Sequence, residues 1–107
     1  MTTIKKKRRY TRVGIPKGVL VAWEHDARRT VSRITILALG GLFITTPDPP
    51  PNGDHVRLIF EIPGGEVRAY AIVRDCQPGK GMGIEFRVME ESSRKRLHDL
   101  MKVLTRV

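Results

Sequence analysis

Residues 56–74 have the sequence VRLIFEIPGGEVRAYAIVR, and this stretch decides the fold class. In its first half an apolar residue occupies every second position: Val56, Leu58, Phe60 and Ile62. The second half repeats the pattern: Val67, Ala69, Ala71 and Val73. A period of two is the pattern of a half-buried β-strand, and the intervening Pro63-Gly64-Gly65 is typical of a hairpin turn. The stretch therefore predicts two antiparallel strands, residues 56–62 and 67–74.

Four further strands flank this hairpin. Segments rich in β-branched and aliphatic residues predict them at residues 19–23, 30–39, 42–46 and 83–88. Gly40-Gly41 interrupts the pattern between the second and third of these segments, which predicts a bulge or a close approach of two backbones. Between the third of these strands and the hairpin, the proline-rich residues 47–53 predict a loop.

The last part of the chain follows a helical period instead. Apolar residues fall at i, i+3, i+4 and i+7: Leu97, Leu100, Met101 and Leu104. We expect Ser92 and Ser93 to cap the start of this helix. The stripe is short, which favours a helix packed on its own domain over a coiled-coil seam. Together the segments predict an all-β fold, a six-stranded antiparallel β-barrel with a C-terminal α-helix.

Positive charge is concentrated at the N-terminus. The 107 residues include 20 Lys or Arg and 11 Asp or Glu, for a formal net charge of +9. Residues 1–12 contain no acidic residue and these basic ones: Lys5, Lys6, Lys7, Arg8, Arg9 and Arg12. We therefore divide the chain into a basic arm, residues 1–12, and a barrel with its C-terminal helix, residues 13–107. The arm favours an anionic partner, although a solvated tail that keeps the protein soluble has the same composition.

Several classes of function find no support in the sequence. Cys76 is the only cysteine and the three histidines are far apart, so we expect no disulfide, no metal site and no cofactor. No P-loop, nucleophile elbow or HExxH motif is present, so we do not expect an enzyme. The apolar stretch 34–44 is shorter than the roughly 20 residues of a membrane span. No apolar region of a signal peptide follows the basic arm, so we expect a cytoplasmic protein without membrane insertion.

The chemistry of the arm lies in the segment Arg8-Arg9-Tyr10-Thr11-Arg12. An arginine guanidinium is planar and always charged, and its fork of donors suits phosphate. The same plane can stack on a nucleobase. Arg8 and Arg12, four residues apart, are therefore suited to clamp a compact phosphorylated ligand.

Three segments, taken in order, resemble the PilZ domain family, the bacterial receptors for cyclic di-GMP. Residues 8–12 resemble the RxxxR arm of the family. Residues 40–44, GGLFI, resemble the end of its second motif, [DN]xSxxG, which often continues as GLF. Residues 81–86, GMGIEF, resemble a characteristic strand that comes before the closing helix. The resemblance extends from Arg8 to about Leu104.

The resemblance implies a fold, a ligand and a partner. The fold is a six-stranded barrel with a C-terminal helix, with the arm wrapped over one face. The ligand is cyclic di-GMP: Arg8, Arg9 and Arg12 would bind its phosphates and stack on guanine, and Gly41 belongs to the motif that recognises a guanine edge. The family passes the signal to motility, adhesion, polysaccharide export or partner enzymes, so a downstream protein partner of unknown identity is also expected.

The second motif departs from the family pattern. With the motif glycine aligned on Gly41, Ile36 stands in place of Asp or Asn, and Ala38 in place of Ser. Neither side chain can form a hydrogen bond, and each lost bond to a polar ligand group costs about 1–3 kcal/mol. We therefore expect binding to be weakened roughly a hundredfold to ten-thousandfold. If Leu37 and Leu39 face the core, Ile36 and Ala38 face outward, where the helix or the arm covers them or a protein partner binds.

Three functions follow from these observations. The first is a cyclic di-GMP receptor with an intact arm and an eroded second motif. The second is a PilZ-like protein-interaction module that does not bind the nucleotide. The third is a basic barrel that binds nucleic acid through its arm and through exposed aromatic residues, Tyr10 and Trp23. Only 6% of the residues are aromatic, and the sequence shows no row of stacking side chains, so we do not expect a nucleic-acid partner.

Overall fold

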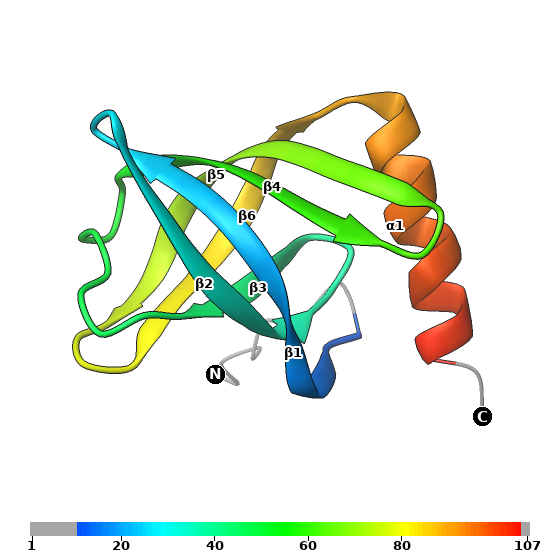
Figure 1. Ribbon diagram of the computed structural model, residues 1–107, viewed down its shortest axis with the longest axis horizontal. Coiled ribbons are helices and arrows are strands. Elements are labelled where there is room, and N and C mark those ends of the chain that lie inside the picture. The colour runs from blue at the N-terminus through cyan, green and yellow to red at the C-terminus, as the bar shows by residue number, and fades with distance from the viewer. Residues whose placement is uncertain (1–10, 106–107) are drawn as a thin grey trace, which may run out of the picture.

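A computed structural model describes residues 11–105, which form a closed antiparallel β-barrel followed by one helix (Figure 1). The elements are β1 (Val13–His25), β2 (Arg28–Leu37), β3 (Gly41–Thr45), β4 (His55–Ile62), β5 (Gly65–Gln77), β6 (Gly81–Met89) and α1 (Glu91–Leu104). The strands follow one another around the barrel in the order β1-β2-β3-β6-β5-β4. The predicted six-stranded antiparallel barrel with a C-terminal helix is therefore confirmed.

The hairpin of β4 and β5 has its turn where the sequence predicts it. Ile62 pairs with Gly65, so that Pro63 and Gly64 form a two-residue turn. Gly64 has a φ of 102°, a conformation that glycine adopts at little cost. The apolar positions at every second residue of both strands are buried in the barrel. The alternation of the sequence thus sets which face of this hairpin forms the core.

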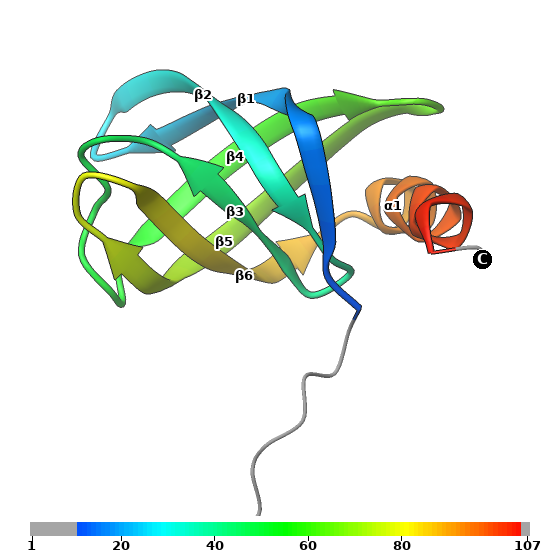
Figure 2. The same cartoon turned by 90° about the horizontal axis from the view of Figure 1, so that it is seen from below.

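The helix closes one end of the barrel. Leu97 and Met101 belong to the same apolar core as the inward-facing side chains of the six strands. Seen from two directions, α1 lies at the end where the described chain begins and where β2 connects to β3 (Figures 1 and 2). This end therefore brings the start of β1, the β2–β3 connection and the helix into one region. No helix within residues 11–105 has the length and apolar character needed to cross a membrane.

The first strand starts earlier than the sequence pattern predicts. Gly14 pairs with Ile36 and Val19 with Ile34, so residues 15–18 form a bulge opposite a single residue of β2. A bulge accommodates Pro16, which cannot donate a ladder hydrogen bond. The prediction relied on alternating apolar residues, and the proline and glycine of the bulge interrupt this alternation. As a result, β1 starts at Val13 rather than at the predicted Val19.

The prediction that Ser92 and Ser93 cap the helix is wrong. The helix already begins at Glu91, with Glu90 in the N-cap position and no capping hydrogen bond from its side chain. Both serines therefore lie within the first turn. Ser92 is exposed, whereas Ser93 is only 2% exposed, and its hydroxyl accepts a hydrogen bond of 3.1 Å from the backbone N–H of Arg68 in β5. Ser93 thus fastens the helix to the barrel.

Replacing Ser93 with alanine is expected to destabilise the protein by about 1–3 kcal/mol, because the N–H of Arg68 loses its acceptor at a largely buried site. Chemical denaturation measures the loss, and hydrogen exchange at the Arg68 amide should become faster. Ser92→Ala, an equivalent change one residue away on the exposed side, is the control. It should leave the free energy of unfolding and the exchange rate of the Arg68 amide unchanged. Equal stability of the two variants would contradict this role of Ser93.

Candidate functional site

The described end of the arm lies beside the second motif. Val13 pairs with Leu37 and Gly14 with Ile36, so the register brings the exposed Arg12 to the level of Ala38. Neighbouring strands are about 4.8 Å apart, which puts the last arginine of the RxxxR segment within side-chain reach of the β2–β3 turn. Arg8 and Arg9 lie outside the described residues.

The β2–β3 turn is built around the two consecutive glycines. The N–H of Ala38 donates to the carbonyl of Gly41 at 2.9 Å, and the N–H of Phe86 donates to the carbonyl of Gly40 at 2.9 Å. A Cβ atom at Gly41 would collide with the backbone carbonyl of Ile84 on β6. The predicted close approach of two backbones is confirmed, and Gly41 therefore has a structural reason to be glycine that does not depend on a ligand. A direct role of Gly41 in ligand binding stays a prediction.

The two positions where the family motif carries polar side chains differ in exposure. β2 has an irregularity between Ile34 and Ile36, which shifts the strict alternation by one residue. Ile36 is half-buried, in line with an outward orientation. Ala38 is only 9% exposed, although it is not among the apolar residues that pack together in the core, which agrees with the alternative that this position is covered. Ala38 follows the end of β2 at Leu37, and its N–H takes part in the turn.

A charged cluster on the outer surface of β5 and β6 lies next to Gly41. Gly41 pairs with Glu85 across β3 and β6. The carboxylate of Glu85 accepts hydrogen bonds from Arg74 at 3.0 and 3.2 Å and forms an ion pair with Arg87 at 3.5 Å. This cluster cannot be predicted from the sequence, because alternation places these residues outward but does not reveal which strands are neighbours. The cluster contributes two guanidinium groups to the surroundings of the second motif.

The environment of Glu85 favours its charged form. The hydrogen bond from Arg74, together with the positive charges of Arg74 and Arg87, lowers the pKa of Glu85 below its ordinary value of 4.5. Glu85 therefore binds fewer protons in the folded chain than in the unfolded chain as the solution becomes acidic. The resulting stabilisation is complete above pH 4.5 and is lost as the pH falls through the lower pKa of the folded state.

Glu85→Gln should remove this stabilisation. At neutral pH the variant is expected to lose at most about 1 kcal/mol of unfolding free energy, because the cluster is exposed to solvent. Thermal unfolding measured over a pH series should show the difference from the parent protein shrinking below pH 4.5. Glu61→Gln is the matched control, since Glu61 is exposed and forms no ion pair among residues 11–105. A difference that stays constant down to strongly acidic pH would argue against the linkage.

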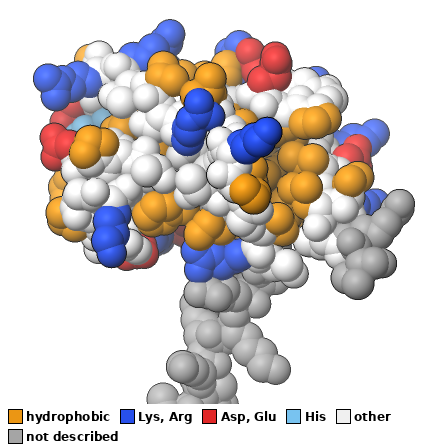
Figure 3. Space-filling model, turned by 60° about the horizontal axis from the view of Figure 1, so that its bottom comes forward, with side chains coloured by type: hydrophobic (Ala, Val, Ile, Leu, Met, Phe, Trp, Pro, Cys, Tyr) orange, Lys and Arg blue, Asp and Glu red, His pale blue; other side chains and the backbone are white. Residues whose placement is uncertain are grey.

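The surface around the start of the described chain is apolar and basic. Hydrophobic side chains cover much of it with basic ones among them, and acidic side chains lie toward its margins (Figure 3). No group of three or more His, Cys, Asp or Glu residues within residues 11–105 is placed to hold a metal ion. The arrangement suits an anion that also presents a planar or apolar surface, since guanidinium groups bind phosphate and stack on rings.

The second aromatic residue proposed for nucleic-acid binding is not available for stacking. Trp23 is 5% exposed and points into the core, and its indole N–H donates to the hydroxyl of Ser32 at 3.0 Å. The expectation that Trp23 is exposed is therefore wrong, because residue 23 falls on the inward phase of β1. Tyr10 lies outside the described residues.

The chain resembles known proteins in both sequence and fold. The sequence profile of the PilZ domain matches residues 6–102, whereas no curated protein sequence matches the chain. The fold is similar to that of the Bacillus subtilis inhibitor of motility MotI/DgrA, with a TM-score of 0.76 and 16% sequence identity over 96% of this chain and 55% of that chain. The chain thus spans little more than half of that structure.

Two further structures share the fold and contain a nucleotide. The PilZ domain of YcgR from Escherichia coli with c-di-GMP gives a TM-score of 0.73 at 15% identity and covers 92% of both chains. The Borreliella burgdorferi PlzA protein in complex with c-di-GMP gives a TM-score of 0.71 at 15% identity over 87% of this chain and 40% of that chain. At these identities the similarity concerns the fold alone, while the profile covers nearly the whole sequence. The chain belongs to the PilZ domain family.

Proposed function

We propose that this PilZ domain binds cyclic di-GMP through the arginines of its arm and acts as a regulatory adaptor rather than as an enzyme. The supporting observation is the register of β1 and β2, which brings Arg12 beside the turn that ends in Gly41. Arg12, at the described end of the arm, is thus a neighbour of the second motif in space although more than twenty residues separate them in the sequence. The proposal includes a cytoplasmic location, as expected from the sequence.

The proposed roles of the arm and of the second motif follow from the chemistry of their residues. Arg8, Arg9 and Arg12 supply positive charge and donors for the two phosphates, and their planes are suited to stack on guanine. Ile36 and Ala38 supply no polar atom from a side chain. Binding would therefore depend on the arm, and the affinity would be lower than that of a domain with a complete second motif.

Isothermal titration calorimetry with cyclic di-GMP tests the proposal. The parent protein should give measurable heats, and Arg8→Ala and Arg12→Ala should each weaken binding about tenfold to a hundredfold, the loss expected for a hydrogen bond to a charged group. Arg94→Ala removes an equal charge from the exposed side of α1 and should have no effect. Flat heats for the parent protein at high ligand concentration would contradict the proposal.

A second candidate function is a protein-interaction module that has lost the nucleotide. The observation in its favour is the apolar pair itself, because Ile36 is half-buried and Ala38 is buried where the family motif carries hydrogen-bonding side chains. A parent protein that binds no cyclic di-GMP would leave this function in place.

A further inference from the structure

Cross-strand pairing aligns one row of outward-facing side chains across five strands of the barrel. Arg29 of β2 pairs with Glu24 of β1, and Glu24 pairs in turn with Arg57 of β4. Arg57 pairs with Tyr70 of β5, and Tyr70 with Val88 of β6. The row therefore runs from two cations that share one anion to an aromatic and an aliphatic side chain.

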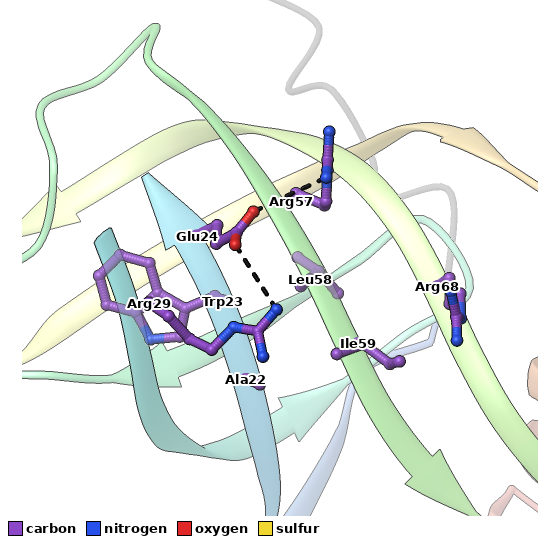
Figure 4. A pocket seen from close by; sticks show the side chains of 8 residues that line it. All are labelled: Ala22, Trp23, Glu24, Arg29, Arg57, Leu58, Ile59 and Arg68. Atoms are coloured by element: carbon purple, nitrogen blue, oxygen red, sulfur yellow. Dashed lines mark ion pairs between the residues drawn. The ribbon is translucent and has the colours of Figure 1, made fainter. Parts of the chain in front are cut away.

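A second row lies two residues along each strand and is mainly aliphatic. Val31 pairs with Ala22, Ala22 with Ile59, and Ile59 with Arg68. A shallow pocket of about 350 Å³ lies between the two rows. In Figure 4, Glu24, Arg29 and Arg57 lie toward one side of the pocket and Arg68 toward the other, with Ile59 between them and Ala22 at the lower margin. We call these two rows together the arginine face.

The guanidinium groups of this face keep donors available for another molecule. Glu24 is 3.5 Å from Arg29 and 3.7 Å from Arg57, distances of ion pairs without a close hydrogen bond. Arg57 also stacks over the ring of Tyr70, 5.0 Å from its centroid. Arg68 donates through Nε to Glu66 at 2.9 Å, which uses only one of its five N–H groups. Three cations thus face two carboxylates, and the face has an excess of positive charge.

Three aliphatic or aromatic members of the face are unusually exposed for their type, while Ala22 and Ile59 are half-buried. Val31 is 64% exposed, Val88 61% and Tyr70 50%. Outward positions of an antiparallel sheet are ordinarily polar, because only the inner face is needed for the core. Arginine and tyrosine around an apolar centre are instead the composition of binding hot spots in protein interfaces. Folding alone therefore does not account for this pattern.

We propose that the arginine face is the docking surface for an acidic, amphipathic segment of a partner protein. Aliphatic side chains of the segment would cover Ala22, Val31 and Ile59, and its carboxylates would pair with Arg57 and Arg68. The net positive charge of the face is complementary to such a segment. On β2 the face includes Arg29 and Val31 near the start of the strand, whereas the turn that ends in Gly41 follows the far end of β2 at Leu37, so docking does not depend on the proposed nucleotide site.

Two other occupants fit the face less well. The carboxylate of Glu24 between two arginines repels the phosphates of a nucleic acid, and Tyr70 is the single exposed aromatic residue of the face, so no row of stacking side chains is present. A second copy of this chain carries a net charge of +9, so two copies repel each other. An acidic protein segment needs no row of stacking side chains and is attracted by the positive charge of the face.

The test uses the full chain, labelled for NMR, and a short synthetic peptide that forms an amphipathic helix with a leucine stripe flanked by glutamates. We expect the peptide to shift the amide signals of Ala22, Ile59 and Arg68. Arg57→Glu should weaken the binding of the peptide about tenfold or more, as expected for a hot-spot residue. Arg87→Glu is the matched control: it makes the same charge change on an arginine that also pairs with a glutamate, outside the face, and should have little effect.

Peptide versions separate the two parts of the proposal. Exchange of the glutamates for glutamines, or of the leucines for serines, should each abolish the shifts. The proposal is overturned if the parent protein shows no shifts, if Arg57→Glu and Arg87→Glu act equally, or if single-stranded oligothymidine shifts the same amides more strongly. The proposal would likewise be overturned if the mass in solution doubled with concentration and the same amides became protected, because the face would then bind a second copy.

Discussion

Gly41→Ala should lower the free energy of unfolding by about 3 kcal/mol, because an added Cβ atom collides with the backbone carbonyl of Ile84. The carbonyl belongs to the β3–β6 ladder and cannot move away without breaking it. For a domain of this size, such a loss corresponds to a melting temperature lower by roughly 10–20 °C. Thermal and chemical unfolding of the purified variant measure the effect.

Gly14→Ala is the control for this substitution. A Cβ atom at Gly14 meets nothing within 4 Å, and Gly14 lies on the strand that leads from the arm into the barrel. Its replacement should change the stability by no more than about 0.5 kcal/mol. If Gly41→Ala folded as stably as this control and lost only nucleotide binding, the glycine would serve the ligand rather than the contact between β3 and β6.

The double substitution Ile36→Asp with Ala38→Ser should tighten binding of cyclic di-GMP by a hundredfold or more. It restores the two polar side chains of the family motif, and each regained hydrogen bond is worth about 1–3 kcal/mol. We expect Ile36→Asp to contribute most of the gain, because Ile36 is half-exposed while Ala38 is buried against the turn. Calorimetry of the single and double variants measures the two contributions.

The matching control adds an equal charge elsewhere on the same strand. Val31→Asp lies on an outward position of β2, away from the turn, and should leave the affinity for cyclic di-GMP unchanged. Tighter binding by both aspartate variants would show an unspecific effect of charge. No gain from the double variant, in a protein that binds the nucleotide, would show that the alignment of the second motif is wrong.

Local sequence patterns were sufficient to predict the elements of the fold. The alternation in residues 56–62 and 67–74 and the turn between them predicted β4 and β5, and the helical stripe predicted α1, because each pattern is contained in one segment. The patterns failed where the backbone departs from its period, as at the bulge of residues 15–18. Ser93 was misassigned because its partner, Arg68, belongs to a different element.

The arrangement of the candidate site could not be predicted, because it depends on which strands are neighbours and on their register. The arm and the second motif were identified from their residue types, but the nearness of Arg12 to the β2–β3 turn follows from the register between β1 and β2. The neighbouring cluster around Glu85 and the arginine face both depend on the pairing of strands that are distant in the chain. The ligand roles of Arg8, Arg9, Arg12 and Gly41 stay predictions that the binding experiments address.

The circular order of the strands restricts how this domain can recruit another protein. Each of β1 to β6 has a hydrogen-bonded neighbour on both sides, but β1 pairs with β4 only over Val21–Glu24. Within residues 11–105 a foreign strand could therefore be added only beside the parts of strands that lie outside these pairs, such as the first half of β1 on its β4 side. Recognition is expected to use mainly side chains on the outer surface, the loops or the helix, and the same closure limits edge-to-edge aggregation of the domain.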